Sequence, residues 1–172
     1  MSFYFPHRFV QNFKGDSEHL KNKRLYTFKS TKSNLWYWVW VECYDYDIYA
    51  IKFHLKAHRH SPKRYNVKTS TFEPRVIVQT CINIMLEIYH ENDNASFGFI
   101  GSNSEGESTN LTKRFRFYRA IMATYFSDKY FEHIELPTKS TYLMINRVRI
   151  NNDHFLIEKI QDVFSELYDY FD

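Results

Sequence analysis

The fold is decided by the stretch Leu35-Trp36-Tyr37-Trp38-Val39-Trp40-Val41, which alternates along its whole length. Side chains of a β-strand point to opposite faces in turn, so all three Trp residues of the chain share one face. Residues 48–55 alternate as well, and Lys52 and His54 share the polar face of that segment. Residues 44–47, Tyr-Asp-Tyr-Asp, lie between the two segments and are typical of a turn. Together they predict an antiparallel hairpin.

Further elements are predicted on both sides of this hairpin. Strands are expected at residues 25–28, 65–68, 96–100, 133–136 and 142–146. Helices are expected at about 74–90 and 112–126, and a last one is expected after a cap at Asn152 or Asp153. This order predicts an α+β fold, a mainly antiparallel sheet with about three helices packed on it. We expect residues 1–172 to form a single domain, with residues 1–23 as an irregular N-terminal segment.

Composition excludes several classes of protein. The chain has 172 residues, of which 19% are aromatic, and a formal net charge of +3. The two cysteines, Cys43 and Cys81, predict neither a disulfide framework nor a zinc site. His54, His58 and His60 match no metal-ligand spacing, so no metal and no cofactor are expected. The sequence contains no apolar run of the length of a signal peptide or a membrane span, so we expect a cytoplasmic protein without a membrane partner.

An arginine-rich helix is the first candidate site. Four basic residues fall within seven positions where this helix begins, although a helix N-terminus favours anions over cations. Arginine clamps phosphate in a fixed geometry, and bare helix amides add to this effect. The predicted binding residues are Ser102, Lys113, Arg114, Arg116, Tyr118 and Arg119. The alternative is a solvated basic face, or salt bridges to Glu105, Glu107, Glu132 or Glu135.

A basic loop at residues 56–64 is the second candidate site and is expected to extend the first. Its predicted binding residues are His58, Arg59, Lys63 and Arg64. Beside a Trp-bearing hairpin, these cations suit nucleic acid, with phosphates on the cations and bases on the rings. The alternative is that the Trp face packs under the helices, which is more typical of three neighbouring Trp residues on a central strand. The sequence leaves both interpretations open.

Catalytic motifs are missing from the sequence, so it does not decide whether the protein is an enzyme. No serine lies in a nucleophile elbow and no cysteine has a catalytic context. If the chain cleaves phosphodiesters, arginines would stabilise the developing charge while Tyr118 or His133 moves a proton. His133 lies between Glu132 and Glu135, which is more typical of a hydrogen-bonded surface histidine.

Residues 101–102 and 112–119 carry a resemblance to a known group of proteins. Arg114, Arg116, Tyr118 and Arg119 resemble the Arg-x-Arg-x-Tyr-Arg helix that follows a Gly-Ser strand end in small, functionally uncharacterised bacterial proteins of Bacteroidetes type. The resemblance covers roughly residues 70–150, and this chain has a longer polar loop between Ser102 and Thr112. It implies a role in a toxin–antitoxin or antiphage locus.

The strand–helix–strand order with Phe117 and Tyr118 on the second helix also resembles the C-terminal half of acetyl-CoA-dependent acetyltransferases. That resemblance implies a general-acid role for the helix tyrosine. The glycine-containing pyrophosphate turn of those enzymes would fall at residues 72–77, which contain no glycine.

These observations predict a small cytoplasmic protein that binds a phosphate-bearing partner, a nucleic acid or a nucleotide, through its arginine-rich helix. Two alternatives stay open. One is a non-catalytic protein–protein interaction module with a protein partner or a second copy of the chain, and the other is a divergent acetyltransferase-like enzyme. Salt separates the first two, because phosphate contacts weaken as salt rises and an aromatic interface does not.

Overall fold

The computed structural model describes residues 4–65, 74–100, 113–136 and 141–167. Its helices are α1 (Pro74–Glu91), α2 (Lys113–Tyr125), α3 (Arg147–Asn152) and α4 (Leu156–Leu167), with short 3-10 helices η1 (Asp45–Asp47) and η2 (Lys56–His58). Its strands are β1 (His7–Lys14), β2 (Leu20–Lys29), β3 (Trp36–Tyr44), β4 (Ile48–Leu55), β5 (Ser96–Ile100), β6 (Phe131–Leu136) and β7 (Thr141–Asn146). The predicted α+β fold is confirmed.

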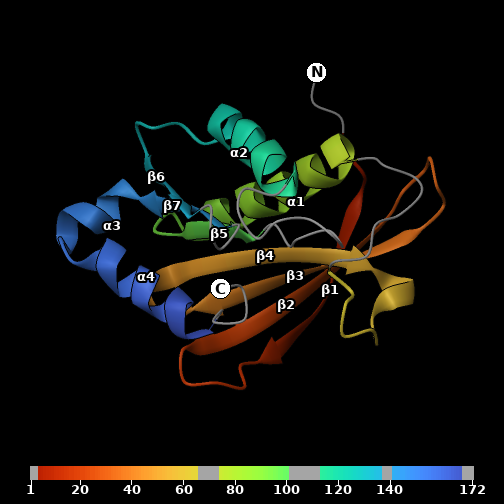
Figure 1. Ribbon diagram of the computed structural model, residues 1–172, viewed down its shortest axis with the longest axis horizontal. Helices are drawn as coiled ribbons and strands as arrows, with labels where there is room; N and C mark the ends of the chain where they lie inside the picture. The colour runs from red at the N-terminus through yellow and green to blue at the C-terminus, as the bar shows by residue number, and fades with distance from the viewer. Residues whose placement is uncertain (1–3, 66–73, 101–112, 137–140, 168–172) are drawn as a thin grey trace.

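One seven-stranded sheet organises the molecule, in the order β1-β2-β3-β4-β5-β7-β6. Strands β1 to β4 form an antiparallel meander, and β5 to β7 continue the sheet through antiparallel pairs. Only the pair between β4 and β5 is parallel, within the described part of the chain. A parallel pair needs a crossover, and α1 supplies it between these two strands (Figure 1).

Helices α1 and α2 cover one face of the sheet. Val39 on β3, Ile51 on β4 and Phe97 on β5 belong to the core on this face, and each is 0% exposed. Ile82 of α1 and Met122 of α2 belong to the same core and are equally buried. The alternation predicted for β3 and β4 is therefore correct: the Val and Tyr side of β3 forms the main core.

Part of the opposite face is covered by α4. Ile48 on β4 and Leu143 on β7 pack there in a second core with the apolar side of α4. That side consists of Leu156, Ile160, Val163 and Phe164. Trp38 and Trp40 lie on another part of this face, away from α1 and α2, and both are half-buried. The interpretation of the Trp face as core under the helices is wrong for the described residues.

The N-terminal segment also differs from its prediction. Residues 1–23 were expected to be irregular, yet β1 lies at the sheet edge and β2 begins at Leu20. Most side chains of β1 are exposed, and a bulge between Phe9 and Gln11 interrupts its register, so no alternating apolar pattern marks it. Of the strand expected at residues 65–68, Tyr65 lies in a turn and the rest lies outside the described residues.

Candidate functional site

The arginine-rich helix is present as α2, and the side chains of Arg116 and Arg119 are among those described. Ser102 lies outside the described residues, as do the side chains of Lys113, Arg114 and Tyr118. Arg116 is exposed. The guanidinium of Arg119 lies 3.5 Å from the carboxylate of Glu135, with both side chains about two-fifths exposed. Such an exposed pair contributes little to stability, and it leaves Arg119 accessible to an anion.

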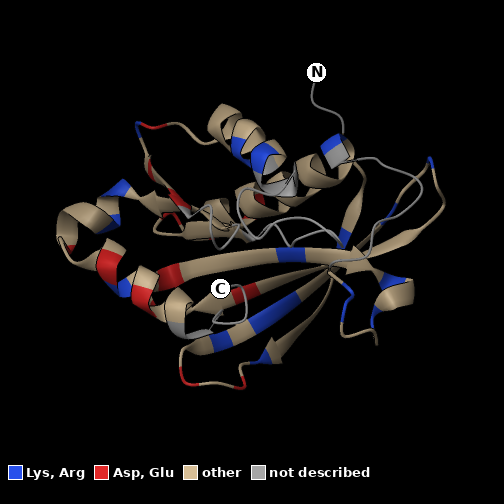
Figure 2. Ribbon diagram, viewed as in Figure 1, with Lys and Arg blue, Asp and Glu red and all other residues tan. Residues whose placement is uncertain are grey.

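The two predicted basic sites lie on different faces of the sheet. Helix α2 packs on the α1 face through Met122, whereas Trp38 and Trp40 lie on the opposite face. Figure 2 shows Lys and Arg residues on α2 and a separate set on β2, on β4 and along the segment that follows β4. The expectation that the basic loop extends the arginine-rich helix into one surface is therefore wrong.

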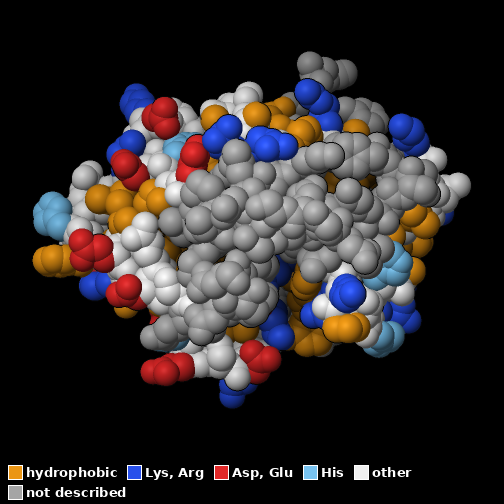
Figure 3. Space-filling model, viewed as in Figure 1, with side chains coloured by type: hydrophobic (Ala, Val, Ile, Leu, Met, Phe, Trp, Pro, Cys, Tyr) orange, Lys and Arg blue, Asp and Glu red, His pale blue; other side chains and the backbone are white. Residues whose placement is uncertain are grey.

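A pocket of about 290 Å³ lies on the Trp face, beyond the part that α4 covers. We call it the β3–β4 pocket. It is lined by Lys23, Trp38, Trp40, Glu42, Lys52, His54, Arg59, Arg64 and Tyr65. Figure 3 shows basic, histidine and hydrophobic side chains gathered over the segment that follows β4, which is yellow in Figure 1.

Strand register builds the floor of this pocket. Trp38 pairs with His54 across β3 and β4, and Trp40 pairs with Lys52. Directly paired residues share a face, so these four side chains form a two-by-two block. Glu42 continues the β3 row. Arg59, Arg64 and Tyr65 come from the segment after β4, which starts with η2 and completes the lining. The ring of Tyr65 lies 5.3 Å from the ring of His54 and 5.7 Å from the ammonium of Lys52.

His54 fixes the orientation of Trp40. Its Nδ1–H donates to the carbonyl of Leu55 over 2.8 Å, and its Nε2 accepts from the indole Nε1–H of Trp40 over 3.1 Å. Burial lowers the pKa of His54, and the nearby charges of Arg64 and His58 lower it further. The imidazole is therefore neutral in the tautomer that the two bonds require. With both nitrogens engaged, His54 acts as a positioning residue.

Two indole rings form a corner in the pocket. Trp38 and Trp40 have ring centroids 6.1 Å apart and an interplanar angle of 82°. Phe13 lies 5.6 Å from Trp40. A planar group stacked on one indole would therefore stand nearly perpendicular to the other indole. Edge-to-face contacts of this kind are among the arrangements that aromatic pairs prefer.

Positive charge dominates the pocket. Four cationic side chains and one carboxylate line it, which with neutral His54 gives a net charge of +3. Lys52 and Glu42 pair over 2.7 Å, and their side chains are only 13% and 15% exposed. Arg64 lies 4.9 Å from the ring centroid of Tyr65, a distance that suits a cation–π contact. The ammonium of Lys52 lies 5.7 Å from the centroid of the same ring, so Tyr65 lies close to both Arg64 and the ion pair.

The sequence predicted part of this site. Arg59 and Arg64 line the pocket as predicted binding residues, whereas His58 and Lys63 are not among its lining residues. Lys23, Glu42 and Lys52 were not predicted as site residues, nor was His54 in its positioning role. The available signal was the shared face of Lys52, His54 and the Trp residues, because cross-strand pairing of two alternating segments brings such positions together.

His133 is held inside the fold. Its Nδ1 accepts from the hydroxyl of Tyr142 over 2.7 Å, and its Nε2–H donates to the carbonyl of Phe126 over 2.7 Å. Burial raises the pKa of Tyr142 to about 12, so this hydroxyl stays protonated. Both ring nitrogens thus have partners within the protein, as expected of the hydrogen-bonded histidine that the sequence left as an alternative to a proton-transfer role.

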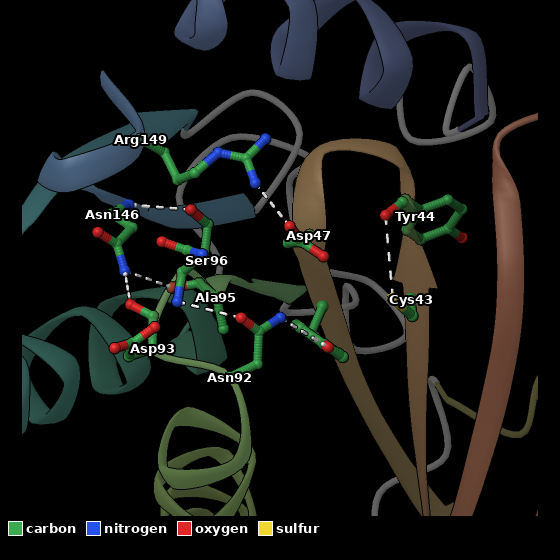
Figure 4. Close-up of polar contacts among 11 residues, drawn as sticks. Cys43, Tyr44, Asp47, Asn92, Asp93, Ala95, Ser96, Asn146 and Arg149 are labelled. Carbon is green, nitrogen blue, oxygen red and sulfur yellow. Dashed lines mark hydrogen bonds and ion pairs between the residues drawn. The ribbon is translucent and has the colours of Figure 1, made fainter. Parts of the chain in front are cut away.

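Asn146, the last residue of β7 and the cap of α3, donates to carbonyls of the loop before β5 (Figure 4). No group of three or more His, Cys, Asp or Glu residues in the described part of the chain is arranged to hold a metal ion. No helix of that part is long and apolar enough to cross a membrane. Comparisons with protein-family models, curated proteins and solved structures found no match.

Proposed function

We propose that this protein binds a phosphate-bearing partner, a nucleic acid or a nucleotide, and that the β3–β4 pocket is its main contact surface. One observation carries the proposal: two indole rings and two arginines line a single pocket on the sheet face that carries the Trp residues. Base–aromatic stacking contributes about 1–3 kcal/mol per base, and arginine contacts phosphate in a fixed geometry. A pocket that offers both is complementary to a nucleotide.

The arginine-rich helix is retained as a second contact for the same class of partner. Arg116 and Arg119 are accessible on α2, on the α1 side of the sheet. Two basic surfaces on opposite faces suit a strand that wraps around an edge of the sheet, or two separate strands. The bacterial cytoplasm and a toxin–antitoxin or antiphage locus, implied by the resemblance of residues 112–119, are the setting we propose for this binding.

Two double variants test the proposal. Arg59→Ala/Arg64→Ala removes two positive charges at the pocket, and Arg116→Ala/Arg119→Ala removes two on α2, so the change in net charge is the same. We expect a fluorescently labelled single-stranded RNA to bind the wild type, with affinity falling as salt rises. The pocket variant should bind at least about tenfold more weakly, and its log–log salt slope should shrink by about 1.4, or 0.7 for each lost phosphate contact.

The matched control decides where binding occurs. If the pocket carries the main contact, the α2 variant keeps its affinity within about threefold, because long-range charge alone has only a modest effect. Equal losses in both variants would contradict the assignment to the pocket. Absence of binding by the folded wild type at low salt would contradict the proposed function itself.

The acetyltransferase-like alternative is favoured by one observation. Strands β4 and β5 are parallel and joined through α1, and α2 follows, which is the strand–helix–strand–helix order behind that resemblance. Fold order alone does not establish a reaction. Calorimetric titration with acetyl-CoA and an assay of acetyl transfer test this alternative. It would be favoured over nucleic-acid binding if acetyl-CoA bound saturably and if Tyr118→Phe kept this binding but abolished acetyl transfer.

A further inference from the structure

Trp36 is the exposed member of the row of Trp residues on β3. Side chains at alternate positions of a strand share a face, so Trp36 lies on the same face as Trp38 and Trp40. Trp36 is 46% exposed, whereas the other two are half-buried and line the β3–β4 pocket. Trp36 is not among the lining residues, so the row of rings continues beyond the pocket.

This row is longer than one nucleotide. Trp36 and Trp40 are four residues apart, which corresponds to about 13 Å of strand. Successive nucleotides of a stacked strand are about 3.4 Å apart, so this length corresponds to about four of them, and to fewer when the strand is extended. A ligand that contacts both Trp36 and the pocket is therefore an oligonucleotide.

Cations flank Trp36 on the sides of both neighbouring strands. Lys29 is its partner on β2, and the Lys29 ammonium lies 5.9 Å from the centroid of the indole ring. On the other side, Tyr37 pairs with Leu55 at the end of β4. The next element is η2, which contacts β3 and begins with the exposed Lys56. A ring between cations suits a base whose phosphates run along the same surface.

Negative charge is scarce on these strands. Strands β1 to β4 contain several Lys and Arg residues and one carboxylate, that of Glu42. Glu42 is paired with Lys52 over 2.7 Å, so its charge is balanced. Lys29 is exposed, and no carboxylate in the described part of the chain pairs with it. Its ammonium can therefore contact a phosphate without breaking an ion pair.

The chemistry of this surface suits unpaired bases without selecting among them. Every base has a flat π-face, so stacking on an indole tolerates any sequence. Bases inside a duplex have both faces covered by their neighbours, and proteins that stack on bases use unpaired ones. A single strand is therefore the form of nucleic acid that can use both the exposed ring and the pocket.

We propose that Trp36 and Lys29 form a second stacking subsite outside the β3–β4 pocket, and that the ligand of this sheet face is a single strand that contacts both. This inference rests on the proposed function and narrows its ligand from any phosphate-bearing partner to a single-stranded oligonucleotide of about three to four nucleotides or more. RNA and DNA present the same stacking faces and phosphates to such a surface, so both belong to the class.

Isothermal titration of the full chain with 5′-UMP and with oligouridines of two, four and eight nucleotides tests the inference. We expect affinity to rise more from two to four nucleotides than from four to eight, because the tetranucleotide fills both subsites. Trp36→Ala should weaken the tetranucleotide about tenfold, within the range for one stacked base, and should leave 5′-UMP and the dinucleotide within about twofold of wild type. Trp36→Phe should restore part of the loss.

Tyr130 provides a matched control. It is 54% exposed, and the ammonium of Lys129 lies 5.4 Å from its ring centroid, so the pair repeats the ring and lysine of Trp36 and Lys29. It precedes β6, the strand at the sheet edge opposite β1. Tyr130→Ala should therefore keep the tetranucleotide affinity within about twofold of wild type.

The two lysines give a second readout that does not depend on substituting Trp36. Lys29→Ala and Lys129→Ala remove one positive charge each. Lys29→Ala should reduce the log–log salt slope for the tetranucleotide by about 0.7, the value for one phosphate contact on a single strand, and Lys129→Ala should leave it unchanged. Equal slopes in the two variants would contradict the role of Lys29.

The outcomes separate this inference from the proposed function. Equal affinity of the wild type for 5′-UMP and the tetranucleotide, or for a blunt-ended duplex and a single strand, overturns the second subsite. A folded Trp36→Ala variant that binds the tetranucleotide as tightly as Tyr130→Ala does the same. In each of these cases, weaker binding by Arg59→Ala/Arg64→Ala would still support the proposed function with the pocket alone. Absence of all binding by the folded wild type overturns both.

Discussion

At the scale of single residues, His54 links the stability of the protein to the shape of its pocket. The ring is 4% exposed and has a hydrogen-bond partner at each nitrogen. Protonation would place a second N–H on the ring, opposite the indole N–H of Trp40, and would break that bond. The neutral form is therefore part of the folded pocket.

The first prediction concerns pH. Burial lowers the pKa of His54 in the folded state, so between the folded and unfolded pKa values the unfolded chain binds more protons. The stability that neutral His54 contributes is fully present above the unfolded pKa of about 6.5 and is lost as pH falls through the folded pKa. His54→Gln removes this dependence. In urea unfolding, the free energies of unfolding of wild type and His54→Gln should therefore become more similar as pH falls from about 7.5 to about 5.5. A difference that stays constant over this range would contradict a neutral, buried His54.

Gly98 shows a different constraint at the residue scale, because it lets α4 approach the sheet. A Cβ atom at this position would lie 3.1 Å from Cδ2 of Leu143 and 3.4 Å from Cζ of Phe164. Both neighbours belong to the second core, so neither has much room to move. The missing side chain at this position therefore allows Phe164 of α4 to pack closely against β5.

We therefore predict that Gly98→Ala lowers the free energy of unfolding by about 1–2 kcal/mol through overpacking. Chemical denaturation checks this value. The double variant Gly98→Ala/Phe164→Leu is the control, because a smaller side chain on α4 makes room for the added methyl group. The two changes should cost less together than the sum of the single variants. A strictly additive result would show that the contact with Phe164 does not limit position 98.

At the scale of elements, Asn146 joins three parts of the chain. Its Nδ2 donates to the carbonyls of Asp93 and Ala95 over 2.8 and 3.2 Å, and its Oδ1 accepts from the amide of Val148 over 3.0 Å (Figure 4). The residue is 2% exposed. One side chain thus caps α3 and satisfies two carbonyls of the turn that leads into β5.

Asn146→Ala should lower the free energy of unfolding by about 2–4 kcal/mol, because it removes a helix cap and leaves buried carbonyls without a donor. Thermal and urea unfolding measure the loss. Asn151→Ala is the matched control, since it makes the same exchange at an exposed position of α3 and should stay within about 0.5 kcal/mol of wild type. Similar losses in both variants would contradict the role of Asn146.

Sequence patterns predicted the elements whose burial alternates clearly. Residues 36–41 and 48–55 lie in strands with the predicted faces, and helix α1 begins at Pro74 as expected. Strand β1 was missed because an exposed edge strand has no apolar alternation to read. Helix α3 was missed because it is short and has no buried residues among its six positions.

Part of the candidate site could also be predicted from the alternation of side chains along the strands. Alternation identifies which residues share a face, so Lys52, His54 and the Trp residues could be grouped in advance. It does not tell which face the helices cover, because this depends on where α1 and α4 pack. The basic residues after β4 were visible as a cluster, but their placement over the Trp rings depends on the end of β4 and the turn at η2.

At the scale of the whole molecule, the sheet is covered unevenly. Two helices bury one face, while α4 buries part of the other, where the pocket also lies. The core thus lies mostly on one side of the sheet, and charged and aromatic residues gather where cover is missing. Stability and binding are therefore assigned to different faces, which allows the pocket variants proposed above to be tested in a folded protein.

The parallel pairing of β4 with β5 has a consequence for how the chain folds. Strands β1 to β4 pair with one another across short connections. The pairing of β4 with β5, which we call the β4–β5 seam, joins residues 48–51 to residues 96–99 and has to close the long crossover through α1. Because loop closure costs entropy before the contacts form, we expect the meander to be structured in the folding transition state and the seam to form later. In stopped-flow measurements, Val39→Ala should mainly slow folding and Phe99→Leu should mainly speed unfolding. Equal φ-values at the two positions would contradict this order of events.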